Sequence, residues 1–106
     1  MNLEEFKATL FLDAPPQGLT GAVLALWHVA NNNWDRAHEL AQAQDDKNGA
    51  WVHAHLHRVE GDLRNAGYWY RRADKSECTA PLETECEDIA TAILGGIVNI
   101  VSNGAP

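Results

Sequence analysis

Two apolar stripes at helical spacing flank Gly61 and Asp62, and this pattern constrains the fold of the 106-residue chain more than any other. The first stripe is Val52, Leu56 and Val59, and the second is Leu63, Ala66, Tyr70 and Ala73. Steps of three and four residues place each stripe on one face of a helix. Glycine commonly ends a helix, and an aspartate side chain can accept the free amides of the next first turn. Residues 49–74 are therefore predicted to form a helical hairpin, with Asn48 as the N-cap of its first helix.

Helical spacing also dominates the first part of the chain, where period-2 alternation is scarce. We predict an N-terminal helix over residues 3–12, ended by Pro15 and Pro16 because proline cannot continue a helix. A first hairpin is predicted over residues 19–44, with its turn at the three asparagines 31–33.

A C-terminal helix is predicted over residues 80–101. Its apolar stripe consists of Leu82, Cys86, Ile89, Ile93, Ile97 and Ile100. The stripe keeps its phase across Gly95 and Gly96, which favours one long helix. The expected fold class is all-α: about six helices in a single domain over residues 1–106, with two antiparallel hairpins and the C-terminal helix as a cap.

Small and aromatic residues recur at defined distances from the predicted turn of the second hairpin. Ala54 lies seven positions before Gly61, and alanine, tyrosine and alanine follow it at positions 66, 70 and 73. This arrangement resembles the hairpin of the tetratricopeptide-repeat (TPR) family, although His53 and His57 replace a leucine and a tyrosine that are usual there. The resemblance implies closely packed, repeat-like helices and a role in protein–protein interaction. Residues 55–73 also resemble an HLHRxEGDxxNAxYWYxRA signature of small bacterial proteins, which implies no particular activity.

The net charge of −7 is unevenly distributed along the chain. Residues 1–46 carry two basic and seven acidic side chains, residues 47–75 carry six and three, and residues 76–106 carry none and five. The basic middle could hold an acidic protein or peptide partner, or the acidic flanks could neutralise it. A net negative chain disfavours nucleic acid, since phosphate binding depends on a dominant positive field.

The first ten residues, MNLEEFKATL, lack the basic start and apolar core of a secretion signal. No apolar stretch reaches the roughly 20 residues that a membrane-spanning helix needs. We therefore expect a cytoplasmic protein that does not enter the membrane and whose two cysteines, Cys78 and Cys86, are reduced thiols. Their acidic neighbours should raise a thiol pKa, which disfavours a nucleophilic role.

An aromatic and arginine cluster is the first candidate binding surface. It comprises Tyr68, Trp69, Arg71 and Arg72, with Arg58 and Arg64 nearby in the sequence. Aromatic and arginine side chains are the usual anchors of protein interfaces. The alternative is that Tyr68 and Trp69 pack at an edge of the domain and make cation–π contacts within it.

Three residues of the first helix of the second hairpin form a candidate metal half-site. His53, His57 and Glu60 lie at i, i+4 and i+7, so they share one helix face. Two imidazoles and a carboxylate suit a transition metal, and His28 or His38 could add a ligand from the preceding hairpin. The alternative is that these histidines are interfacial and hydrogen-bonded to their neighbours.

No phosphate loop, nucleophile elbow or catalytic dyad stands out in the sequence. We therefore predict a non-enzymatic helical-repeat module that binds or scaffolds a protein or acidic peptide and needs no cofactor. One alternative is a small metal-dependent enzyme or metal-binding protein that uses His53, His57 and Glu60. A second alternative is a structural subunit that forms a homodimer through residues 89–101 of its C-terminal helix.

Overall fold

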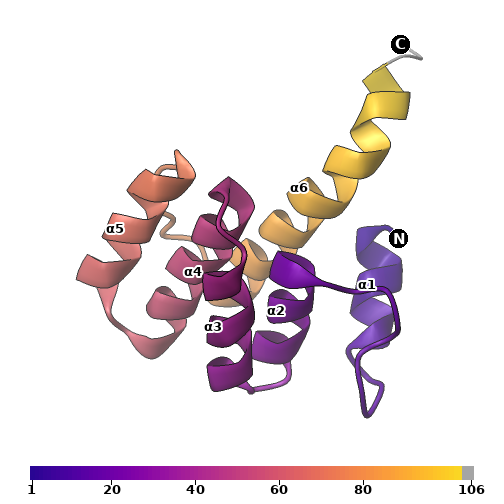
Figure 1. The fold of residues 1–106 in the computed structure, drawn as a ribbon, viewed down its shortest axis with the longest axis horizontal. Coiled ribbons are helices and arrows are strands. Elements are labelled where there is room, and N and C mark those ends of the chain that lie inside the picture. Colours follow the sequence, from indigo (N-terminus) through magenta and orange to yellow (C-terminus); the bar gives the residue numbers. More distant parts are fainter. Residues whose placement is uncertain (104–106) are drawn as a thin grey trace.

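The computed structural model describes the backbone of residues 1–103 and the side chains of residues 1–95. Within these residues the fold is all-α, as predicted, and contains six helices (Figure 1). They are α1 (Leu3–Thr9), α2 (Gly21–Ala30), α3 (Trp34–Ala43), α4 (Lys47–Glu60), α5 (Leu63–Ala73) and α6 (Leu82–Asn103). None of the helices in the described part of the chain is long and apolar enough to span a membrane.

Helices α2 to α5 lie next to one another in chain order, because α2 packs on α3, α3 on α4, and α4 on α5 (Figure 1). Helix α6 crosses this row and contacts α4, α2 and α1. Helix α4 is therefore the central element, with α2, α3, α5 and α6 packed around it.

The turn between α4 and α5 forms as the sequence predicts. Gly61 has a φ of 87°, a left-handed conformation that glycine adopts without steric cost. The side chain of Asp62 then accepts a hydrogen bond of 3.2 Å from the backbone N–H of Asn65. This short connection places α5 directly beside α4.

Predicted and observed helix boundaries differ by two or three residues in several places, and the structure explains two of these differences. The N-cap of α4 is Asp46 rather than Asn48, because the Asp46 carboxylate accepts a 2.8 Å hydrogen bond from the backbone N–H of Gly49. Helix α1 ends at Thr9 rather than at residue 12. The carbonyl of Thr9 instead accepts hydrogen bonds from the indole N–H of Trp27 and from the amide of Leu12. The bond from Leu12 closes a turn, so the helix does not continue.

The main core lies where α2, α3, α4 and α6 meet and is closed by α1. Its largest buried side chains are Phe6, Leu26, Trp27, Leu56 and Ile89. A smaller cluster of Ala54, Ala66 and Tyr70 fills the α4–α5 interface. The buried alanines of this interface let the two helices approach closely. Ile97 and Ile100, the last members of the predicted C-terminal stripe, lie outside the described side chains.

Gly49 lies at a tight contact between the end of α3 and the start of α4. A Cβ atom at this position would lie 1.9 Å from the backbone carbonyl oxygen of Gln44, whereas a Cβ at Gly95 would meet no atom within 4 Å. We expect Gly49→Ala to lower the free energy of unfolding by about 2 kcal/mol, since a backbone clash cannot relax cheaply. Gly95→Ala is the matched control. It should raise the stability by about 0.5–1 kcal/mol, because alanine favours a helix more than glycine does.

Urea unfolding followed by circular dichroism measures both variants. If Gly49→Ala and Gly95→Ala changed the free energy of unfolding equally, the tight contact between α3 and α4 would be contradicted.

Candidate metal centre

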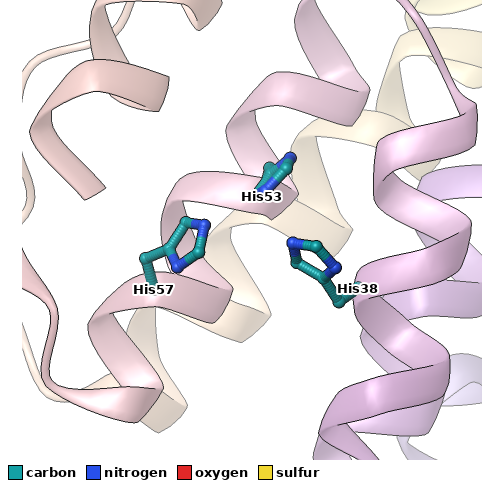
Figure 2. Close-up of side chains that lie close together, drawn as sticks. All are labelled: His38, His53 and His57. Carbon is teal, nitrogen blue, oxygen red and sulfur yellow. The ribbon is translucent and has the colours of Figure 1, made fainter. Parts of the chain in front are cut away.

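Helices α3 and α4 bring three histidines together. His53 and His57 lie one turn apart on α4 and are 3% and 5% exposed, and His38 reaches them from α3 (Figure 2). One nitrogen of each ring lies within 4.8 Å of those of the other two rings. The three imidazoles therefore converge on one small volume between the two helices.

Two tryptophans hold this histidine cluster from either side. Trp34 stacks on His38 with ring centroids 4.8 Å apart, and Trp69 of α5 stacks on His53 at 3.8 Å. The indole N–H of Trp34 also donates a 2.7 Å hydrogen bond to the carbonyl of Leu56, which anchors it to α4. These contacts restrict the rotation of two of the three imidazoles.

The histidine cluster contains polar atoms that no hydrogen bond satisfies. The Nδ1 atoms of His53 and His57 are buried and have no hydrogen-bond partner among the described residues. Buried polar groups normally have such a partner, so each exception calls for an explanation. A bound metal ion would supply the missing interaction, because a neutral imidazole nitrogen is a common metal ligand.

The protonation states of His38 and His53 also suit a metal. Burial, reinforced by the neighbouring rings of His38 and His57, lowers the pKa of His53 to about 4. Burial also lowers the pKa of His38, and the nearby His57 acts in the same direction. At neutral pH both rings therefore carry the free lone pair that a metal requires.

The distances allow metal binding after a small movement. Tetrahedral zinc–imidazole bonds of 2.0–2.1 Å imply nitrogen separations of about 3.3 Å. The ligand nitrogens of the three histidines lie within 4.8 Å of one another, so they would have to approach by at most about 1.5 Å.

The structure places Glu60 beside the three-histidine cluster rather than in it. The Glu60 carboxylate lies 3.6 Å from Nδ1 of His57 and groups with His57 and exposed Asp62. The structure therefore brings together His38, His53 and His57 rather than the predicted trio of His53, His57 and Glu60. Of the two histidines named as additional ligands, His38 joins the group, whereas His28 instead packs edge-on against Trp27 at 5.2 Å.

The predicted aromatic and arginine surface separates into two parts. On α5, the guanidinium of Arg72 lies 5.2 Å from the ring centroid of Trp69 and 5.9 Å from that of Tyr68. Tyr68 is half-exposed, and its hydroxyl accepts a 3.1 Å hydrogen bond from Arg72. Arg64 and Arg71 are also exposed on α5. Arg58 of α4 does not join this surface, because its guanidinium points into a buried network.

That buried network centres on Glu85, and the sequence analysis missed it. The Glu85 carboxylate accepts hydrogen bonds from Nδ1 of His55 at 2.7 Å, from Arg58 at 2.8 Å and from the hydroxyl of Tyr70. Arg58 also donates to the carbonyl of Ala80 at 2.6 Å. A usable signal was the position of Glu85 four residues before Ile89, on the apolar face.

The network shifts the pKa values of its members. Hydrogen bonds from His55, Tyr70 and Arg58 outweigh the effect of burial and lower the pKa of Glu85 to about 2. Burial and the Glu85 carboxylate together raise the pKa of Tyr70. Next to this network, burial and then the neighbouring glutamates raise the pKa of Cys86 to about 11, in the direction expected from the sequence. A thiol in this state is a poor nucleophile.

No protein-family model, curated protein or solved structure matches this chain.

The Glu85 network predicts a defined pH dependence of stability. A carboxylate whose pKa is depressed on folding stabilises the fold above its unfolded pKa, and this contribution is lost as the pH falls towards the folded pKa. For Glu85 the loss spans about pH 4.5 to 2 and amounts to about 3 kcal/mol. Glu85→Gln should flatten the decline in stability over this window and lower stability at pH 7, where Arg58 loses its buried partner.

Thermal unfolding between pH 2 and pH 7 measures this effect. Glu83→Gln, on the exposed side of the same turn, is the control and should follow the unmodified chain. An undiminished slope for Glu85→Gln would show that the carboxylate does not titrate with folding.

Proposed function

We propose that this chain binds a divalent transition-metal ion, with zinc as the reference case, through His38, His53 and His57. The observation that carries the proposal is the convergence of three imidazoles from two helices around buried nitrogens without hydrogen-bond partners. The proposal concerns binding and does not require catalysis.

The chemistry of the ligands defines the class of metal. Imidazole suits zinc, copper, iron and nickel, whereas calcium and magnesium prefer oxygen ligands. Three protein ligands leave the fourth tetrahedral position of zinc for water or another small molecule. A site built from His38, His53 and His57 alone therefore favours a transition metal with one open position.

Residues around the histidine cluster support this proposal. The Glu60 carboxylate lies 3.6 Å from Nδ1 of His57, so it places negative charge beside a nitrogen that lacks a hydrogen-bond partner. A carboxylate at this distance favours a cation bound to the same nitrogen. Trp34 and Trp69 restrict His38 and His53, so less side-chain entropy is lost on binding.

Metal titration of tag-free, chelator-treated protein tests the proposal. We expect one equivalent of Zn²⁺ to bind by calorimetry, and Co²⁺ to give the visible absorption bands of a tetrahedral site. His38→Ala and His57→Gln should each weaken zinc binding by at least about 100-fold, since even outer partners of metal ligands contribute 10–100-fold.

His28→Gln is the matched control, because this histidine lies outside the cluster and should leave the zinc affinity unchanged. Circular dichroism verifies that each variant is folded. The site would be rejected if the unmodified chain bound less than about a tenth of an equivalent of zinc. It would also be rejected if the His38 and His57 variants bound zinc as tightly as the unmodified chain.

A second candidate function is recognition of an acidic peptide or protein by the surface of Tyr68, Trp69, Arg71 and Arg72. It is supported by the position of Arg72, which lies over two aromatic rings while remaining open to solvent, and by the resemblance of the α4–α5 hairpin to tetratricopeptide repeats. Replacing Arg71 and Arg72 with alanine should abolish salt-sensitive binding of a fluorescent poly-glutamate peptide. Unchanged binding at low ionic strength would exclude these arginines as the contact.

A further inference from the structure

A groove with a volume of about 450 Å³ lies between α1, α2, α4 and α6. Its size is within the range of small-molecule sites in proteins, about 300–1,000 Å³. His55 lines the groove. Residues two positions apart point to different sides of a helix, so His55 lies on a different face of α4 from His53 and His57. The groove is thus separate from the proposed metal site.

Apolar side chains form most of the wall of the groove. Three large hydrophobic residues that remain exposed in the folded chain line it: Phe11 at 91% exposure, Val59 at 38% and Leu82 at 40%. Exposed apolar residues are ordinary when scattered, but their gathering around one hollow indicates a binding surface. Phe6 and Leu10 continue the apolar wall from the side of α1.

One polar side chain of the lining, His55, is buried. His55 is 2% exposed, and its Nδ1 lies 2.7 Å from a Glu85 oxygen. In its neutral form the ring that donates Nδ1–H to Glu85 presents Nε2 as an acceptor. The hydrogen bond described for the His55 side chain uses Nδ1, and Nε2 is not among the fully buried atoms without a partner, so within the described residues Nε2 is the atom of His55 left for a ligand.

The Glu85 network holds this acceptor in place. Arg58 and Tyr70 bind the same carboxylate, so the orientation of His55 depends on three donors from α4 and α5 rather than on one contact. A polar side chain that lines an apolar groove and is held by a buried network is suited to orient a ligand.

The charges at the edge of the groove restrict the ligand further. Glu83 and Glu87 both line it, and Lys7 is paired with Glu87 at 3.5 Å. An anionic head group would therefore meet a net negative edge, which disfavours carboxylates and phosphates.

We propose that this groove binds a small uncharged amphiphile whose hydroxyl or N–H donates a hydrogen bond to Nε2 of His55. The apolar body of the ligand lies against Phe6, Leu10, Phe11 and Val59. The ligand class is thus neutral phenols, indoles and alcohols of similar size.

Three naphthalene compounds separate the parts of this proposal. 2-Naphthol should bind saturably with one equivalent. Naphthalene lacks the donor and should bind roughly tenfold more weakly, the value of one net hydrogen bond. 2-Naphthoate carries an anionic head group and should bind more weakly than 2-naphthol. Tighter or equal binding of either analogue would overturn the proposal.

Nuclear magnetic resonance of ¹⁵N-histidine-labelled protein locates the bound probe. Saturation with 2-naphthol should shift the Nε2 resonance of His55, while the resonances of His38, His53 and His57 stay in place. Because this readout needs no substitution, it remains informative even if variants of the Glu85 network fail to fold. Saturable binding without a change at His55 would overturn the assignment.

A matched pair of variants tests the groove itself. Val59→Trp fills the groove and should weaken 2-naphthol binding at least tenfold. Leu63→Trp introduces the same side chain at an exposed position of α5 outside the groove, and should leave binding unchanged. Equal affinities in the two variants would overturn the proposal.

Light scattering tests whether a second copy of the chain occupies the groove instead. A dimer that 2-naphthol does not dissociate and that Phe11→Ser converts to a monomer would assign the groove to self-association and overturn the proposal.

Discussion

The carboxylate of Glu85 joins α6 to the α4–α5 hairpin, and the shape of the molecule around α4 depends on this interaction. Burying a charged group costs several kcal/mol unless it is paired and hydrogen-bonded. Here Arg58 supplies the opposite charge, and His55 and Tyr70 occupy further lone pairs of the carboxylate. These three contacts therefore hold the start of α6 against the α4–α5 hairpin.

The Glu85 interaction also affects what the neighbouring groups can do. Tyr70 is simultaneously part of the alanine-rich α4–α5 interface and a donor to Glu85, so the hairpin contact and the docking of α6 are coupled. His55, which lines the apolar groove, is held by the same carboxylate through its Nδ1. One buried charge thus connects the packing of three helices with the polarity of a surface hollow.

Helix α4 carries chemistry on two of its faces because helices surround it. His53 and His57 lie one turn apart and meet His38, while His55 is rotated away from them and meets Glu85. The alternation of three histidines in the sequence therefore does not make one cluster of three. The third imidazole of the metal candidate comes from α3, and Trp34 and Trp69 from α3 and α5 complete its surroundings.

Local patterns in the sequence determined the all-α fold class, the positions of the hairpin turns and the shared face of His53 and His57. These features depend on residues within about one helical turn of each other, so spacing and cap chemistry suffice to predict them. The early end of α1 depends on a contact from Trp27, 18 residues from Thr9, and the sequence did not reveal it. The Asp46 cap is a local contact with the amide of Gly49, so it was within reach of the sequence, and the prediction of Asn48 chose the wrong one of two capping residues.

Only the tertiary structure decided that His38 joins the histidine cluster, that Arg58 turns inward and that Glu85 is buried. These outcomes depend on residues 15 to 30 positions apart, such as Tyr70 and Glu85 or His55 and Glu85. Their proximity follows from how the helices cross, which helical periodicity does not specify.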